Sequence, residues 1–472
     1  MNHHHAGLPQ AQPSSPSRPR PLSAATREAV ERLGPLLPEL AEELAALVAL
    51  PSVAFPGFPE EPVLRAAHAT ADLLRRSGAA DARLLDIPGG YPAVYAEVPG
   101  PPGAPTVLLY AHYDVQPAPD DQRWSTDPWT ATTGADGRLY GRGAADDKSG
   151  VVAHAATLRA FEGRPPVHLK ILVEGEEETV SHLGPYVTAH PEMFACDAFV
   201  IADLGNVRTG EPALTTALRG TAVCDLTVTA LDAPVHSGVF GGPVPDAYLA
   251  LSRIVASLHD DTGNVVVPGL HHAEWPGADL AADELRAAAG MAEGVEVIGS
   301  GTVASHLWAR PSASVLGVDV PARDGAPNVL HASVAARISM RVPPGADPAR
   351  ELELLMEHLR AAAPWGVRVE VEPVKTGQPF RADTAHPAFA AAREAMGTAF
   401  GRAAGTIGGG GAIGLVATLQ SVAPGAGVVL WGAEDMAGAR IHAGDESVDL
   451  AELARIVTAQ TLFLGLLGDA GE

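Results

Sequence analysis

The chain has 472 residues and a formal net charge of −24, from 56 acidic and 32 basic side chains. A surface this acidic repels polyanions, which excludes nucleic acid and anionic membranes as expected partners, and the length favours more than one domain. The only two cysteines, Cys196 and Cys224, lie in apolar sequence, so neither a disulfide framework nor a thiolate metal site is expected.

Residues 1–22 are rich in Pro, Ser and Gln and are predicted to form a disordered tail. No apolar run near the start resembles a secretion signal, and none elsewhere is expected to span a bilayer. The expected location is therefore the cytoplasm.

Helical and strand patterns alternate along the next part of the chain. From Ser23 to Ala49 the apolar residues recur at helical spacing, and Pro51 ends that pattern. Beyond it, helical segments alternate with short strands such as "TVLLYAHYDV" and "VHLKILVEG". This alternation predicts an α/β domain, a mixed sheet flanked by helices, in which ligands bind beyond the carboxyl ends of the strands.

The pattern changes near Arg219. The segments "GTAVCDLTVTAL" and "SVAARISMRVPP" alternate apolar and polar residues, as strands of a half-exposed sheet do. We expect an inserted α+β domain over residues 219–345. The α/β domain would then consist of residues 23–218 and 346–472.

Polar residues follow the ends of five predicted strands or strand-like segments. These sites carry His112 with Asp114, then Asp146, then Glu177 with Glu178, then Asp203, and far down the chain His442. Imidazole nitrogen and carboxylate oxygen form a ligand set that suits zinc or a similar divalent ion. Each signal alone is weak, because a strand-end Asp is as often a helix cap. The combination is what indicates a metal site.

The spacing within these sites suggests separate roles. His112 and Asp114 share one face of a strand, so Asp114 can fix the imidazole tautomer of His112. The adjacent Glu177 and Glu178 point different ways, so one can bind metal while the other acts as a base. The acidic run in "ILVEGEEETV" is otherwise explained only by a solvated loop or a helix N-terminus. A pair of ions about 3.5–4 Å apart needs a bridging carboxylate, and the Asp of "GRGAAD" is the candidate.

Several longer motifs carry a family resemblance from about residue 25 to the end. They are "LLYAHYDVQPA", "WSTDPWTATTGADGRLYGRGAADDKSG", "VEGEEE", "HSGVFGG", "ISMRVPPG" and "GAEDMAGARIHAGDES". They resemble the dinuclear-zinc metallopeptidase family of carnosinase-type dipeptidases, aminoacylases, and acetylornithine and succinyl-diaminopimelate deacylases. The motifs "HSGVFGG" and "YGRGAADDK" favour the dipeptidase branch.

The resemblance implies two divalent ions per chain, expected to be zinc, with manganese and cobalt also compatible. It implies that Asp146 bridges the two ions and that the other ligands are His112, Glu178, Asp203 and His442. It also implies that Glu177 is the general base and that Asp114 orients His112.

For the inserted domain, the resemblance implies a lid that also forms a homodimer. His236 in "VHSGVFGG" resembles an oxyanion-binding histidine that the partner subunit often contributes. Arg341 in "ISMRV" matches an arginine for the substrate carboxylate, and Asn328 in "PNVLHA" matches a position near the substrate. The simpler alternatives are that His236 caps a loop and that Arg341 is a surface strand residue.

One motif departs from the family pattern. The segment "TIGGGGAIGLVATL" resembles a substrate-binding Gly-Gly-Ser-Ile-Pro loop, but Ala412 replaces the serine and Gly414 the proline, while Gly411 is kept. A hydroxyl and a rigid residue are therefore absent, although glycines still allow close backbone approach. We expect hydrolysis of a small peptide, namely a dipeptide. Two alternatives stay open: hydrolysis of N-acyl amino acids, and a metal-binding protein without catalysis.

Overall fold

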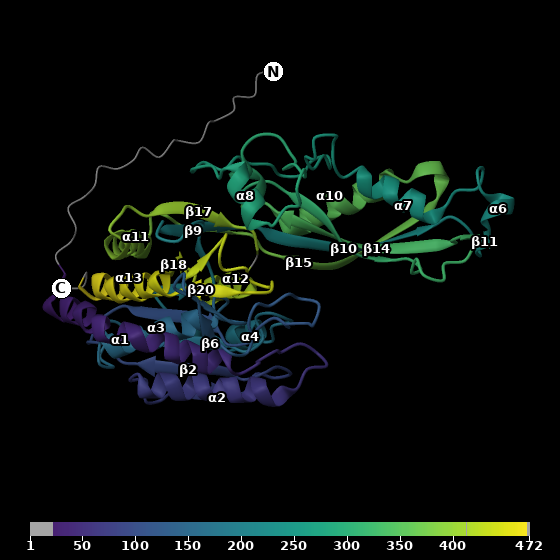
Figure 1. Ribbon diagram of the computed structural model, residues 1–472. Helices are drawn as coiled ribbons and strands as arrows, with labels where there is room; N and C mark the ends of the chain where they lie inside the picture. The colour runs from purple at the N-terminus through teal and green to yellow at the C-terminus, as the bar shows by residue number, and fades with distance from the viewer. Residues whose placement is uncertain (1–21, 412, 470–472) are drawn as a thin grey trace, which may run out of the picture.

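The computed structural model describes residues 22–411 and 413–469, arranged as two bodies (Figure 1). The first is built around a six-stranded sheet and the second around a four-stranded sheet. The predicted tail, apart from Leu22, and the loop residue Ala412 lie outside the described residues.

The six-stranded sheet has the strand order β1-β2-β6-β3-β7-β18. Its strands are β1 (Arg83–Leu85), β2 (Ala93–Val98), β6 (His168–Glu174), β3 (Thr106–His112), β7 (Ala198–Ile201) and β18 (Gly427–Leu430). Strands β6, β3, β7 and β18 are parallel to one another, whereas β2 runs antiparallel to both β1 and β6. The sheet is therefore mixed, as predicted.

Helices cover both faces of this sheet because its strands are apolar on both sides. In β3, Val107 and Leu109 enter one core, whereas Leu108 and Tyr110 enter the other. The first core is completed by α1 (Ala24–Val48), α2 (Glu60–Arg76), α3 (Lys148–Ala160), α11 (Pro387–Phe400) and α13 (Leu450–Gly468). The second is completed by α4 (Leu183–Ala189), α5 (Pro191–Phe194) and α12 (Gly414–Val422). The predicted α/β class is confirmed.

Helix α13 corrects one expectation from the sequence. Over the described residues it is the one helix long and apolar enough to cross a membrane, with a mean hydropathy of 1.5 in its most apolar window. Of that window, 67% is buried within the protein, and Leu453, Val457 and Phe463 belong to the first core. The apolar length of α13 is thus explained by packing against the sheet.

The second body contains the sheet β12-β14-β10-β15. Its strands are β12 (Ser312–Asp319), β14 (Ser333–Val342), β10 (Gly220–Thr229) and β15 (Arg368–Gly377), all antiparallel to their neighbours. Helices α7 (Ala247–Ala256) and α10 (Pro348–Ala361) share a core with this sheet. The sequence-based boundary at residue 345 is therefore wrong, because α10 packs on the second sheet and β15 is one of its strands.

Short elements complete the fold. They are β4 (Thr132–Thr133), β5 (Arg138–Tyr140), β8 (Gly205–Asn206), β9 (Ala213–Leu218), β11 (Val235–His236), β13 (Val329–Leu330), β16 (Phe380–Arg381), β17 (Gly405–Gly409), β19 (Glu434–Asp435), β20 (Ser447–Asp449), α6 (Ser237–Phe240), α8 (Ala282–Ala288), α9 (Val303–Trp308) and η1 (Pro364–Gly366). The chain passes to the second body between β9 and β10 and returns between β15 and β16.

Candidate metal centre

The parallel strands bring the predicted ligands to one edge of the sheet. His112 is the last residue of β3, Glu177 and Glu178 follow β6, and Asp203 follows β7. The carboxyl ends of parallel strands lie at the same edge, which is where ligands bind in open α/β sheets. Asp146 joins them from the loop that precedes α3.

His112 lies at the centre of one group of ligand atoms. Its Nε2 is 2.9 Å from Oδ1 of Asp146 and 3.6 Å from Oδ1 of Asp203. The side chain is buried, and this Nε2 has no hydrogen bond of acceptable geometry to any described residue. A buried imidazole nitrogen that faces two carboxylates without such a bond fits a metal ligand.

A second group forms around His442. Its Nε2 is 3.0 Å from Oδ2 of Asp146 and 3.2 Å from Oε2 of Glu178. Asp146 therefore offers one carboxylate oxygen to each histidine, which is the arrangement that a bridging carboxylate requires. The side-chain amide of Gln116 donates to Oε2 of Glu178 at 2.7 Å and so helps to place it.

His442 is positioned by a strained loop. Arg440, His442 and Asp445 all adopt positive φ angles, of 49°, 62° and 58°. Such conformations persist only where the surroundings hold them. The carboxylate of Asp445 accepts from the backbone N–H and the hydroxyl of Ser125, and the carbonyl oxygen of His442 accepts from the Gln122 amide at 2.9 Å.

The carboxylate of Asp114 lies closer to the backbone of Glu177 and Glu178 than to the imidazole of His112. Its Oδ1 accepts the backbone N–H of Glu177 and its Oδ2 that of Glu178, both at 3.1 Å. The nearest acceptor to Nδ1 of His112 is the carbonyl oxygen of Asp114 at 3.0 Å, while its carboxylate is 3.5 Å away. The same residue thus holds both the tautomer of His112 and the backbone of the two glutamates.

Two buried residues behind the site were not found from the sequence. Nη1 of Arg142 lies 2.6 Å from Oε2 of Glu446, and both side chains are only 1% exposed. Oε1 of Glu446 accepts the backbone N–H groups of Ala145 and Asp146 at 3.1 and 3.2 Å. This ion pair therefore ties the loop of His442 to the loop of Asp146.

The burial of carboxylates and imidazoles in one cluster shifts the pKa values of several of these groups. Burial alone would lower the pKa of His112, but Asp114, Asp146 and Asp203 raise it well above its usual range. Hydrogen bonds to Asp146 and Glu178 raise the pKa of His442 to about 10. Burial and the Asp203 carboxylate raise the pKa of Glu177 well above its usual range. The imidazoles thus hold protons that divalent cations would displace.

The donors present fit two divalent ions. Ligand atoms of Asp146, Glu178 and His442 lie within 4.8 Å of one another, and so do those of the group His112, Asp147 and Asp203. Asp147 also accepts the backbone N–H of His112 at 3.2 Å and caps α3. Because that carboxylate already has these partners, Asp146, 2.9 Å from His112, is the better candidate for a shared ligand.

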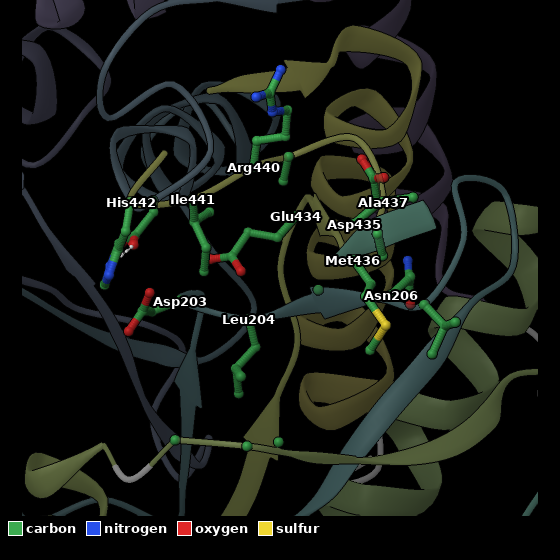
Figure 2. Close-up of a pocket in the computed structure, with 18 of the residues that line it drawn as sticks. Asp203, Leu204, Asn206, Glu434, Asp435, Met436, Ala437, Arg440, Ile441 and His442 are labelled. Atoms are coloured by element: carbon green, nitrogen blue, oxygen red, sulfur yellow. Dashed lines mark hydrogen bonds and ion pairs between the residues drawn. The ribbon is translucent and has the colours of Figure 1, made fainter. Parts of the chain in front are cut away.

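The cluster opens onto a cavity of about 840 Å³. Its walls include Asp146, Glu177, Glu178, Asp203, His442 and the glycine run Gly408–Gly411. Figure 2 shows His442 and Asp203 on one side of this cavity, and Glu434 pointing toward them. Gly411 thus lies where a substrate-binding loop is expected, whereas Ala412 is not described.

Three predicted residues do not join the cluster. His236 is exposed in β11, where its Nδ1 accepts the N–H of Gly238 at 3.0 Å, and the carbonyl of the exposed Asn328 accepts from Ser237. Arg341 is half-buried in β14, opposite Thr221 of β10. None of the three lines the cavity, and β11 lies at the far end of the second body (Figure 1).

Sequence reasoning also missed Glu434. It follows β18 as the proposed ligands follow their strands, and its oxygen Oε1 is buried without a hydrogen-bond partner among the described residues. Burial and the carboxylates of Asp146 and Asp203 raise its pKa well above the usual range. Its strand-end position was the signal that could have found it.

A mixed α/β sheet with paired histidine and carboxylate groups at the carboxyl ends of its strands is typical of a metal-dependent enzyme. The model of the peptidase family M20/M25/M40 matches residues 108–465. The chain belongs to this family of metallopeptidases and is therefore a metallopeptidase-type hydrolase.

Individual relatives agree with this assignment. The chain is 40% identical over 370 residues to a cysteinylglycine-S-conjugate dipeptidase of Corynebacterium striatum, covering 76% of this chain and 81% of the relative. It is 31% identical over 394 residues to a β-Ala-His dipeptidase of Rattus norvegicus, covering 77% and 80%. The structure of human carnosine dipeptidase 1 superposes with a TM-score of 0.80 at 26% identity, covering 95% of this chain and all of that one. The dipeptidase Dug1p of Saccharomyces cerevisiae has the same fold, with a TM-score of 0.81 at 24% identity, covering 95% and 99%.

Proposed function

We propose that the protein hydrolyses the amide bond of dipeptides with two zinc ions per chain. His112, Asp203 and Asp146 would hold one ion, and Asp146, Glu178 and His442 the other. When bound, such ions activate water and polarise the scissile carbonyl. Manganese and cobalt suit the same donors, so metal analysis of the purified protein is needed to decide which ion is native.

The observation that carries this proposal is the placement of Glu177. Its neighbour Glu178 contacts His442, whereas Glu177 is in the wall of the same cavity and its carboxylate pairs with no described residue. The backbone of both is held by Asp114. A carboxylate that is positioned but unpaired beside the ligands can accept a proton from water and return it to the leaving amine. This placement disfavours a metal-binding protein without catalysis.

The second body would act as a lid and as a homodimer interface. Strand β12 is an outer strand of its sheet and exposes Val315, Leu316 and Val318, while α7 exposes Tyr248 and Leu249. An exposed apolar edge strand favours pairing with another chain. We infer that His236 and Asn328 reach the cavity of the partner subunit, where His236 would stabilise the oxyanion, and that Arg341 binds the substrate carboxylate.

Sedimentation tests the dimer directly. We expect the wild type to sediment as a dimer and the Leu316→Glu variant to sediment as a monomer. If the wild type is a monomer and still hydrolyses substrate at full rate, His236 does not act in the cavity of a partner subunit. The cytoplasmic location stays a prediction from composition, checked by cell fractionation.

Hydrolysis of N-acyl amino acids is the second candidate. It is favoured by the glycine run, because Gly408–Gly411 offers no side chain to hold a peptide. The metal-loaded protein should be assayed against Cys-Gly, β-Ala-His and other dipeptides, alongside matched N-acyl amino acids. Dipeptide turnover is expected, and turnover of acyl compounds alone would reverse the assignment.

A further inference from the structure

Glu434 is a half-buried residue in the wall of the cavity, and neither proposed ion site uses its carboxylate. Its oxygen Oε1 is buried and has no hydrogen-bond partner in the part of the chain that the structure describes, and a carboxylate oxygen of Glu434 lies within 4.8 Å of carboxylate oxygens of Asp146 and Asp203. No Lys, Arg or His among the described residues forms an ion pair with it. An unpaired carboxylate in such a position costs free energy unless a cation or donor satisfies it.

The backbone of Glu434 is held firmly beside Asp203. In β19 it pairs with Gly205 of β8. A Cβ at Gly205 would lie 2.0 Å from the carbonyl oxygen of Glu434, and a Cβ at Gly432 would lie 1.8 Å from that of Leu204. Only glycine permits this approach at both positions. The two segments therefore pack in direct backbone contact, which fixes where the Glu434 side chain begins.

The adjacent acidic residue, Asp435, has a different environment from Glu434. Asp435 lies 2.7 Å from Nη2 of Arg138 and accepts the N–H of Gly438. In Figure 2 the carboxylate of Glu434 points toward Asp203 and His442, and that of Asp435 points elsewhere. Both residues line the cavity, but Asp435 forms an ion pair within the protein, whereas Glu434 forms none with a described residue.

The two candidate substrate classes differ by one cation. A dipeptide has a free ammonium group close to the scissile carbonyl, whereas an N-acyl amino acid has none. The carbonyl must approach the ligand cluster, so the ammonium would enter the part of the cavity that Glu434 lines. The glycine run Gly408–Gly411, in the wall of the same cavity, can offer backbone groups but no side-chain charge.

We propose that Glu434 binds the free ammonium group of the substrate and so makes the enzyme select dipeptides over N-acyl amino acids. This inference rests on the proposed dipeptidase function. It assigns the missing counter-ion of Glu434 to the substrate, so the carboxylate is satisfied only when a dipeptide is bound.

The test uses a substrate pair that differs only in the ammonium group. Alanylglycine and N-propionylglycine are assayed as substrates, and the latter also as a competitive inhibitor, with metal-loaded wild type and Glu434→Gln. The variant should lose roughly 30-fold or more in kcat/KM for alanylglycine, mainly through KM, because the bound ammonium group would then lack its anionic partner. Its kcat/KM and inhibition constant for N-propionylglycine should change less than about threefold.

Two further variants serve as controls. Glu434→Asp keeps the charge and should recover part of the preference, and it replaces the glutamine variant should that one not fold. Glu357→Gln removes an exposed charge from α10 and should match wild type.

The possible outcomes separate cleanly. Equal losses on both compounds would overturn the inference, and so would a metal content below that of wild type, which would make Glu434 a ligand. A wild type that does not cleave alanylglycine or any other dipeptide would instead reject the proposed function itself.

Discussion

The carboxylate of Asp114 accepts the backbone N–H of Glu178 at 3.1 Å, and its other oxygen does the same for Glu177. Glu177 and Glu178 follow Asp114 by 63 and 64 positions in the chain, and the one side chain of Asp114 holds the backbone of both. This contact sets the positions of the proposed base and of a proposed metal ligand together, and it also lies beside His112.

Asp114→Asn should weaken both metal binding and turnover. The amide can accept only one of the two N–H groups, and its NH₂ group opposes the other. Loss of such a supporting residue typically costs about 10–100-fold in metal affinity or activity. Chelator competition and kcat/KM measure the two effects. Asp120→Asn, on an exposed residue of the same loop, should behave as wild type. An unchanged Asp114 variant would show that the loop needs no such anchor.

Removing the metal should lower the melting temperature. Without cations, the carboxylates of Asp146, Asp203 and Glu434 face one another within 4.8 Å. Like charges at this distance repel in a buried site, and bound ions offset the repulsion. Chelation should therefore reduce Tm, and added Zn²⁺ should restore it. In His442→Ala the bound metal should fall from two ions toward one per chain. Full retention of two ions in that variant would argue against its role as a ligand.

The buried pair Arg142 and Glu446 should be needed for folding stability. Arg142→Met leaves the Glu446 carboxylate buried without its cation, which typically costs about 3–5 kcal/mol in the free energy of unfolding. Urea unfolding measures this loss. The exposed pair of Arg65 and Glu61 provides the control, since Arg65→Met should cost less than about 1 kcal/mol. If the double variant Arg142→Met with Glu446→Gln is no more stable than Arg142→Met, the explanation by an unpaired charge is wrong.

Stability should fall in mild acid through His154. Burial lowers the pKa of His154 to about 4, although its Nδ1 lies 3.1 Å from Oε1 of Gln460. As the pH falls, His154 is therefore protonated near pH 6.5 in the unfolded chain, but only near pH 4 in the folded protein. The contribution of His154 to stability is complete above about pH 6.5 and is lost as the pH falls toward 4, by about 3 kcal/mol in total.

The pH dependence of unfolding checks this sign. His154→Gln should flatten the dependence between about pH 6.5 and 4. His68→Gln, on the exposed face of α2, should leave the profile as in wild type. A profile that stays equally steep in His154→Gln would place the acid sensitivity in other groups.

The strand-end ligands could be predicted because the carboxyl ends of parallel strands share an edge. The local sequence pattern alone is enough to predict that His112, Glu178 and Asp203 lie near one another. In the structure, Nε2 of His112 lies 2.9 Å from Asp146 and 3.6 Å from Asp203, and Nε2 of His442 lies 3.2 Å from Glu178.

Other features depend on tertiary contacts that no local pattern contains. The sheet membership of β15 is decided by its pairing with β10, so the domain boundary was misplaced. Glu446 contacts the Asp146 loop from a loop around His442 that takes positive φ angles at non-glycine residues, which the sequence does not indicate. Glu434 likewise gains its position from close glycine contacts at Gly205 and Gly432.

The central claim, that Glu177 activates water beside two bound ions, is tested most directly by Glu177→Gln. Metal content and dipeptide turnover should be measured on the same preparation. We predict two ions per chain, as in wild type, with kcat reduced by about 10²–10⁴-fold. Undiminished turnover by a variant that still holds two ions would contradict this account.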